Sequence, residues 1–134
     1  MSGSNAKMLK VRSDRLKEMQ EKVWSNVAKL RSSMGENIVV QKSNQDVAPA
    51  TTFLPVVVKD GDDLIRHMGD RGIETRAYYG KMLWDYPSLA DVHRNGNLEV
   101  STRLKGNVIA LPCHAMLSDT ELSKICDALS DYKN

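Results

Sequence analysis

Two cysteines, with His93 and His114 among the three histidines, are the first candidates of this sequence for covalent chemistry. Cys113 directly precedes His114, and a thiol beside an imidazole serves some enzymes as nucleophile and base. Adjacent side chains of an extended chain point to opposite faces, so these two cannot bond to each other. Cys113 and Cys126 also lack the paired C-x-x-C spacing of a structural zinc site. We expect buried thiols, no catalytic residue and no metal site, and an unrelated small enzyme using His93 or His114 is disfavoured.

An irregular segment over residues 80–97 carries two aromatic side chains, Trp84 and Tyr86. Loops of this length in a small domain are more often functional than filler, so we expect a ligand or a partner there. Trp24 lies beside the apolar stripe of the first predicted helix, where it either widens the buried face or marks a docking surface. Trp24, Trp84 and Tyr86 together form the candidate partner surface.

Four helices are predicted. The first is long and amphipathic over residues 13–34, because apolar residues recur at every third or fourth position: Leu16, Met19, Val23, Val27, Leu30 and Met34. The others cover residues 63–70 after a turn and N-cap within DGDD (60–63), residues 100–105, and a closing segment that starts at a capping box of Ser118 and Glu121. Gly72 is expected to end the second helix in a left-handed conformation.

Four short strands are predicted from clustered β-branched residues, at 38–40, 51–58, 73–79 and 108–111. Pro55 cannot donate to a ladder, so it implies an edge position or a local break. Alternation in the third strand places Ile73, Thr75, Ala77 and Tyr79 on one face and Glu74, Arg76 and Tyr78 on the other. These elements predict an open α/β sandwich, a small sheet covered by the first and last helices.

Length and composition fit one soluble domain, with 134 residues, 41% hydrophobic and 27% charged. The formal charge of +2 includes no basic block, so nucleic acid is not an expected partner. No apolar run approaches the ~18 residues that span a bilayer, and the N-terminus does not resemble a signal peptide, so we expect no membrane partner and a cytoplasmic location. Residues 1–12 are interpreted as a disordered or cloning-derived leader and residues 13–134 as the single domain.

The order and spacing of four segments resemble the C-terminal small domain of the DegT/StrS family of pyridoxal-phosphate-dependent sugar aminotransferases, which have fold type I. The segments are DDLI (62–65), GIETRAYY (72–79), IALP (109–112) and LSDTEL (117–122). The resemblance implies an α+β-like fold, in which a small, mostly antiparallel sheet is covered by a long N-terminal helix and a C-terminal helix.

The resemblance also implies a chemistry that needs more than this chain. In the family a large domain holds pyridoxal phosphate through a lysine Schiff base, a homodimer completes each active site, and glutamate aminates a nucleotide-linked keto-sugar. Lys81, Lys105 and Lys124 lie outside any Ser/Thr-rich phosphate cradle. We therefore expect no catalytic residue here and no pyridoxal phosphate bound by this chain alone.

The resemblance implies that the segment after the GIETR strand faces the active-site entrance, and three residues fall on positions that match the family strand: Arg76, Tyr78 and Tyr79. An arginine pairs bidentately with a carboxylate or phosphate, and a tyrosine offers a stacking face, so they are the candidate substrate-binding residues. Alternatively, Arg76 pairs with a neighbouring acid in solvent, and one tyrosine packs into the core. Where relatives commonly carry His or Gln before a Pro-aromatic pair, this chain has LWDYPSL (83–89).

Two functions from different classes remain. The first is a stand-alone or truncated small domain of a nucleotide-sugar aminotransferase, which pairs with a separate large domain through its first helix and aromatic loop. The second is a non-enzymatic binding or oligomerisation module that retains the fold and uses the aromatic partner surface. A homodimer formed through the first helix fits either.

Overall fold

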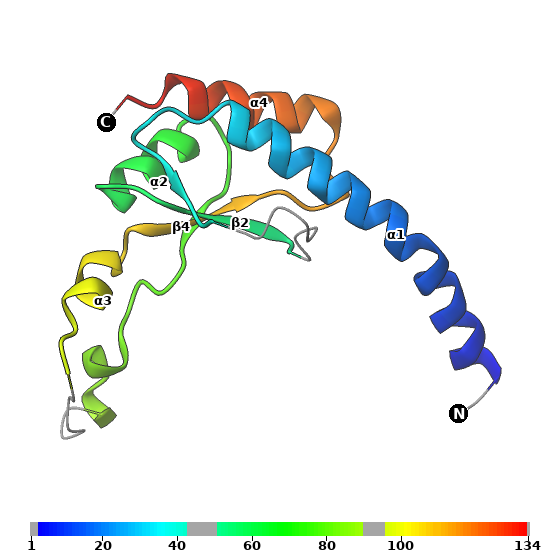
Figure 1. Ribbon diagram of the computed structural model, residues 1–134, viewed down its shortest axis with the longest axis horizontal. Coiled ribbons are helices and arrows are strands. Elements are labelled where there is room, and N and C mark those ends of the chain that lie inside the picture. Colours follow the sequence, from blue (N-terminus) through cyan, green and yellow to red (C-terminus); the bar gives the residue numbers. More distant parts are fainter. Residues whose placement is uncertain (1–2, 43–50, 90–95, 134) are drawn as a thin grey trace.

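The computed structural model describes residues 3–42, 51–89 and 96–133, with side chains from Ala6 onward. Figure 1 shows a small sheet, helices packed along it and a long helix that projects beyond it. The helices are α1 (Gly3–Ser32), α2 (Gly61–Gly69), α3 (Glu99–Leu104) and α4 (Asp119–Asp131), with one-turn 3₁₀ helices η1 (Leu83–Asp85) and η2 (Pro87–Leu89). The strands are β1 (Val39–Val40), β2 (Phe53–Val57), β3 (Arg76–Ala77) and β4 (Val108–Pro112).

The described strands form one antiparallel sheet in the order β1-β2-β4-β3. The central strands β2 and β4 pair over five residues, from Phe53 opposite Pro112 to Val57 opposite Val108. The edge strands β1 and β3 contribute two residues each. This arrangement confirms the predicted fold, in which a small antiparallel sheet carries helices.

Pro55 lies in a central strand, but its missing N–H costs no ladder bond. Val58 donates to the carbonyl of Asn107 at 3.1 Å, so alternation along β2 turns the nitrogens of Leu54 and Val56 toward β4 and that of Pro55 away from it. On that side β1 pairs only with Val56 and Val57. Pro55 therefore lies at a local edge of the sheet, because β1 ends before it reaches the proline.

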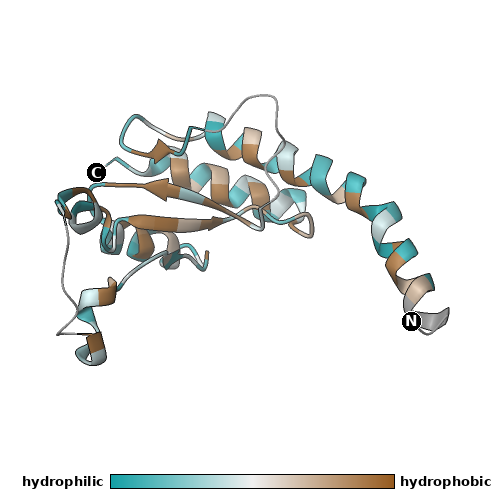
Figure 2. Ribbon diagram, turned by 60° about the horizontal axis from the view of Figure 1, so that its bottom comes forward, coloured by the Kyte–Doolittle hydropathy of each residue, from teal (hydrophilic) through white to brown (hydrophobic). Residues whose placement is uncertain are grey.

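One face of the sheet carries the core. Leu54, Val56, Ile109 and Leu111 alternate along the two central strands and are at most 4% exposed. They join one cluster with buried residues of α1, α2 and α4, so these three helices share this face. Figure 2 shows that both central strands are hydrophobic along most of their length. The opposite face has no described helix on it, and the side chains of β2 and β4 on that face are half-buried.

Helix α1 is divided into a covered and an uncovered half. Val23, Val27 and Leu30 are buried as the spacing predicts, but Leu16 and Met19 are 53% and 46% exposed, so their predicted burial is wrong. The helix also starts at Gly3 and so takes in most of residues 1–12, the segment interpreted from the sequence as a disordered or cloning-derived leader. The backbone follows local helix propensity there, while the sheet and α4 end too early to cover that half (Figure 1).

Local capping signals fix the starts of α2 and α4, and α2 begins at Gly61, two residues before the predicted start. The carboxylate of Asp60 accepts from the Asp63 N–H at 3.0 Å, and Ser118 and Glu121 form the reciprocal capping box. Gly72 has φ of +65°, and the Ile73 N–H reaches the Met68 carbonyl at 3.0 Å, as in a Schellman motif. None of the described helices is long and apolar enough to cross a membrane.

The division of α1 predicts a contrast between two leucines of the same helix. Leu30→Ala, at 0% exposure, should lower the free energy of unfolding by about 2–5 kcal/mol, because it leaves a cavity. Leu16→Ala, at 53% exposure, should change it by less than about 0.5 kcal/mol. Urea unfolding followed by circular dichroism measures both values. Equal losses would show that the projecting half of α1 is packed in the isolated chain.

Candidate functional site

Arg76 and Tyr78 lie on the uncovered face of the sheet, at its β3 edge. Arg76 is opposite Ala110 in the β3–β4 pairing, and the Tyr78 N–H continues the ladder to the Val108 carbonyl at 2.7 Å. Side chains two positions apart on a strand share a face, so both project on the side away from the core. The sequence-based alternation is therefore confirmed for these two residues.

An aromatic cluster crosses β4 on this face. The rings of Phe53 on β2 and Tyr78 beside β3 are 4.9 Å apart at their centroids, although β4 lies between their strands. On this face Phe53 lies opposite Pro112 and Tyr78 follows opposite Val108, with Ala110 between these two residues along β4. The Tyr79 ring lies 4.3 Å from that of Tyr78, edge to face.

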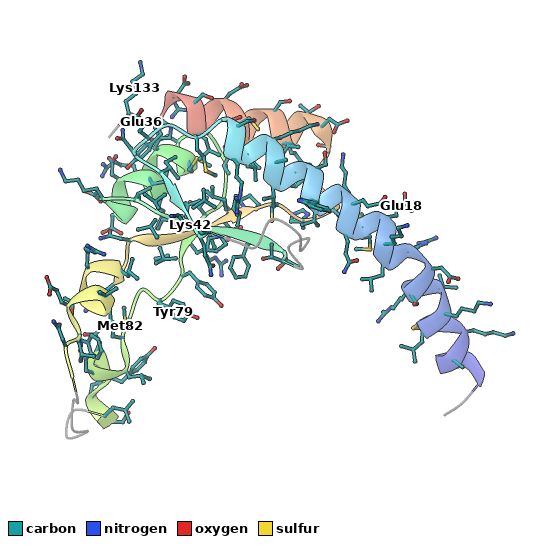
Figure 3. The ribbon with its side chains drawn as sticks, viewed as in Figure 1. Glu18, Glu36, Lys42, Tyr79, Met82 and Lys133 are labelled. Carbon is teal, nitrogen blue, oxygen red and sulfur yellow. The ribbon has the colours of Figure 1, made fainter. Side chains whose placement is uncertain are left out.

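Tyr79 turns the chain out of the sheet. Its φ is +67°, in the left-handed region that residues other than glycine rarely adopt. The prediction that Tyr79 shares the buried face of Ile73 and Thr75 is wrong, because this turn leaves it 62% exposed. A hydrogen bond and charge repulsion from Tyr78 raise the pKa of Tyr79. Figure 3 shows Tyr79 where the sheet ends, with Met82 farther along the chain.

The guanidinium of Arg76 is bound to the neighbouring Glu74. Its Nε and Nη2 atoms lie 3.1 and 2.6 Å from one carboxylate oxygen of Glu74. The structure thus contains the alternative given above, in which Arg76 pairs with a neighbouring acid in solvent. Both side chains are more than three-quarters exposed, at 82% and 77%. Such a pair contributes little stability, so a ligand's carboxylate or phosphate can take the place of Glu74.

A hollow of about 440 Å³ adjoins this pair, between the link from α2 to β3, the end of β4 and α4. Phe53, Glu74, Arg76, His114 and Lys124 are among its lining residues. Phe53 and Arg76 thus belong both to the hollow and to the exposed face with the tyrosines. We call Phe53, Arg76, Tyr78 and Tyr79 the Arg76 surface, which offers a cation, ring faces and a concave neighbour.

The described residues do not offer a lysine suited to bind pyridoxal phosphate covalently. A Schiff-base lysine needs an enclosed pocket that also holds the phosphate. None of the described lysines is buried. Lys105 is ion-paired with Asp85 at 2.8 Å, Lys81 lies 6.0 Å from the ring centre of Tyr86, and Lys124 is exposed beside the hollow.

Cys113 is a buried thiol, and Cys126 is half-buried. Burial raises the pKa of Cys113 to about 11, and its side chain belongs to the core while that of His114 is exposed. The buried Asn26 of α1 fixes this segment, since its amide donates to the carbonyls of Cys113 and His114 at 3.4 and 3.1 Å. Within the described ranges, no group of three His, Cys, Asp or Glu gathers as metal ligands.

The three residues of the candidate partner surface are not brought together. Trp84 and Tyr86 lie in and beside η1, on a segment that extends away from the sheet, whereas Trp24 is on α1 across the sheet (Figure 1). Trp24 and Tyr86 are each about half exposed, and Trp84 is half-buried. His93 lies outside the described residues.

Comparison with known families assigns the chain. The model of the DegT/DnrJ/EryC1/StrS aminotransferase family matches residues 1–130. The chain belongs to this family. The matched range begins at the first residue, so the whole of α1 lies within it. No curated protein matches the sequence.

Solved aminotransferases share the fold. DesV from S. venezuelae, in complex with a ketimine intermediate, is 21% identical with a TM-score of 0.79, over 92% of this chain and 34% of its own. A Brucella abortus member of the family is 20% identical with a TM-score of 0.77, over 88% and 32%. Helicobacter pylori PseC, involved in pseudoaminic acid biosynthesis, is 13% identical with a TM-score of 0.73, over 89% and 34%. This chain thus spans about a third of their length.

The sequence analysis missed one exposed apolar surface at the junction of α1 with the turn before α4. Met19 and Met116, the latter 81% exposed, line a hollow there with Ala115. The apolar spacing of α1 indicated the stripe, but spacing alone does not tell which of its residues the domain covers.

The thiols provide a test of the absence of a cysteine nucleophile. At pH 8, Ellman's reagent should label Cys126 quickly and Cys113 at least about a hundredfold more slowly. At a pH three units below its pKa, a thiol is only about 0.1% ionised, and Cys113 is also buried. In denaturant both should react, and Cys126→Ser should remove the fast phase. Fast labelling of Cys113 in the native chain would contradict the buried-thiol assignment.

Proposed function

We propose that this chain acts as the small domain of a nucleotide-sugar aminotransferase and is catalytically incomplete without a large domain that binds pyridoxal phosphate. The observation that carries the proposal is the extent of the match. The family model covers residues 1–130, yet solved relatives are about three times as long. In this proposal the large domain supplies the cofactor and its lysine, either from the same polypeptide or from a separate one.

The Arg76 surface supplies this domain's share of the substrate site. A nucleotide sugar carries a planar base and a diphosphate, and the surface places exposed tyrosine rings beside an arginine on one strand edge. Glu74 holds the guanidinium until an anion replaces it. The amino donor glutamate presents a carboxylate of the same charge, so both substrates are chemically suited to Arg76.

The alternative is a non-enzymatic binding or oligomerisation module that retains the fold. Its supporting observation is the exposed apolar segment around η1, where Leu83 is 72% and Tyr86 45% exposed. That segment also departs from the pattern common among relatives. The two functions differ in whether the Arg76 surface binds a nucleotide sugar.

The cofactor proposal predicts the result of adding pyridoxal phosphate to the purified chain. After the excess is removed, we expect no retained absorbance band of a lysine aldimine, because exposed lysines form only labile imines. Borohydride reduction followed by peptide mass spectrometry locates any adduct, and Lys124→Arg is the control for the lysine beside the hollow. A stable band fixed by borohydride on one lysine would overturn the claim of incompleteness.

The substrate proposal predicts a ligand-dependent melting temperature. At ten times its Kd, UDP-N-acetylglucosamine should stabilise the chain by about 1.4 kcal/mol, a rise of about 3–6 °C for this size. Arg76→Ala should abolish the rise, whereas Arg103→Ala, an exposed arginine of α3, should leave it intact. No shift with this probe or with dTDP-glucose would favour the non-enzymatic module.

A further inference from the structure

The pairing of β3 with β4 stops at Arg76, which lies opposite Ala110. The Tyr78 N–H donates to β4, and hydrogen-bonded pairs of an antiparallel ladder recur at every second residue. The bonded pair after Arg76 would therefore join Glu74 to Pro112. Pro112 has no N–H to donate, so the ladder ends and the two strands separate. The hollow of about 440 Å³ lies at this opening, since residues of both strands and of α4 line it.

The inner wall of this hollow is apolar. Three side chains of its lining belong to the buried core: Ile73, Leu117 and Ile125. The half-buried Phe53 adds an aromatic ring. Ligand pockets of proteins commonly have volumes of about 300–1,000 Å³, mostly apolar walls and a few polar groups. The size and the lining of this hollow thus suit a small organic molecule.

Lys124 of α4 brings a cation without a counter-ion to the hollow. Its ammonium group lies close to the turn before β3, because a Cβ on Gly72 would be 3.4 Å from the lysine Nζ. It forms no hydrogen bond or ion pair with any residue that the structure describes. The other charged side chains of the lining are engaged. Glu74 binds Arg76, and Glu121 accepts the hydrogen bonds of the α4 capping box.

These charges favour a ligand with a single negative charge. A monoanion compensates Lys124, which also repels cations. A dianion would bring a further negative charge toward the carboxylates of Glu74 and Glu121, which line the same hollow. The ring of His114 is also part of the lining and offers one more nitrogen for hydrogen bonding.

Thr75 lines the hollow and carries a hydroxyl without a partner. The residue is 8% exposed, and its Oγ1 atom forms no hydrogen bond within the described chain. An unbonded buried hydroxyl destabilises a fold, so valine, which has the same shape, would be more stable here unless something bonds the threonine. Rotation about χ1 moves the hydroxyl among three staggered positions. A carboxylate in the hollow supplies the missing acceptor once this rotation turns the hydroxyl toward it.

We infer that the hollow is a second ligand site, which binds a monocarboxylate with an apolar body. The carboxylate pairs with Lys124 and accepts a hydrogen bond from Thr75, while the apolar body lies against Phe53 and Ile125. The inference goes beyond the proposed function, because this site uses neither tyrosine of the Arg76 surface. Since Phe53 and Arg76 line the hollow as well, a molecule bound there lies directly beside that surface.

A titration with 3-phenylpropionate tests this site in the full chain, followed by ¹H–¹⁵N correlation spectra. We expect saturable shifts of the amides of Gly72, Thr75 and Ile125, with a Kd of about 1 mM or tighter for so small a ligand. The alcohol 3-phenylpropanol, which has the same body without the charge, should bind at least about tenfold more weakly. Phenyl phosphate, which is largely dianionic at neutral pH, should also bind more weakly than the carboxylate.

Substitutions separate the roles of the two polar residues. Lys124→Gln should weaken 3-phenylpropionate at least about tenfold and leave 3-phenylpropanol unchanged. Lys59→Gln is the matched control, because Lys59 is also exposed but lies outside the lining, and it should change neither Kd. Thr75→Val should weaken the carboxylate at least about threefold, yet raise the melting temperature of the free chain by about 3–6 °C. Thr75→Ser keeps the hydroxyl and should keep the affinity.

Several outcomes would overturn the site. These are the absence of saturable shifts, equal binding of 3-phenylpropanol, and binding that survives Lys124→Gln. Shifts confined to Tyr78 and Tyr79 would assign the carboxylate to the Arg76 surface instead. Tighter binding of phenyl phosphate would overturn the assignment to a monoanion. The proposed function is tested separately by the nucleotide-sugar and cofactor experiments, so it can stand if this site fails.

Discussion

Pairing of β2 with β4 is the constraint on which the rest of this fold depends. The two strands are about fifty residues apart in the sequence, yet their register sets Leu54 opposite Leu111 and Val56 opposite Ile109. A slip of either strand by one residue would turn the two core side chains of that strand to the uncovered face. Helices α1, α2 and α4 bury their apolar faces against this set and against one another, so the strand pair fixes the surface on which all three pack.

The same pairing limits how much of α1 the domain covers. The core ends near Val23, and the helix continues toward Gly3 with its apolar face still in line. A helix propagates by local hydrogen bonds and does not need a neighbour at every turn. Its projecting half is therefore helical although no described element covers it. The family match begins at residue 1 and so includes this half.

The other face of the sheet carries Arg76 and Tyr78, two of the candidate substrate-binding residues. It lacks a covering helix among the described elements, and the rings of Phe53 and Tyr78 meet there across β4. The left-handed turn at Tyr79 then directs the chain away from the sheet and holds a second ring beside the first. Backbone strain of this kind persists only where surrounding contacts maintain it. At Tyr79 the ring contact with Tyr78 is such a contact, and it lies next to Arg76 along the chain.

The sequence by itself determined what depends on nearest neighbours along the chain. The cap of α2, the Ser118 capping box, the Gly72 turn and the face shared by Arg76 and Tyr78 all follow from local spacing. Only the tertiary structure decided which half of the α1 stripe is buried, why Pro55 can occupy a central strand, and that Tyr79 leaves its predicted face. A repeating pattern marks a face as apolar, but whether that face is covered depends on where distant strands and helices end.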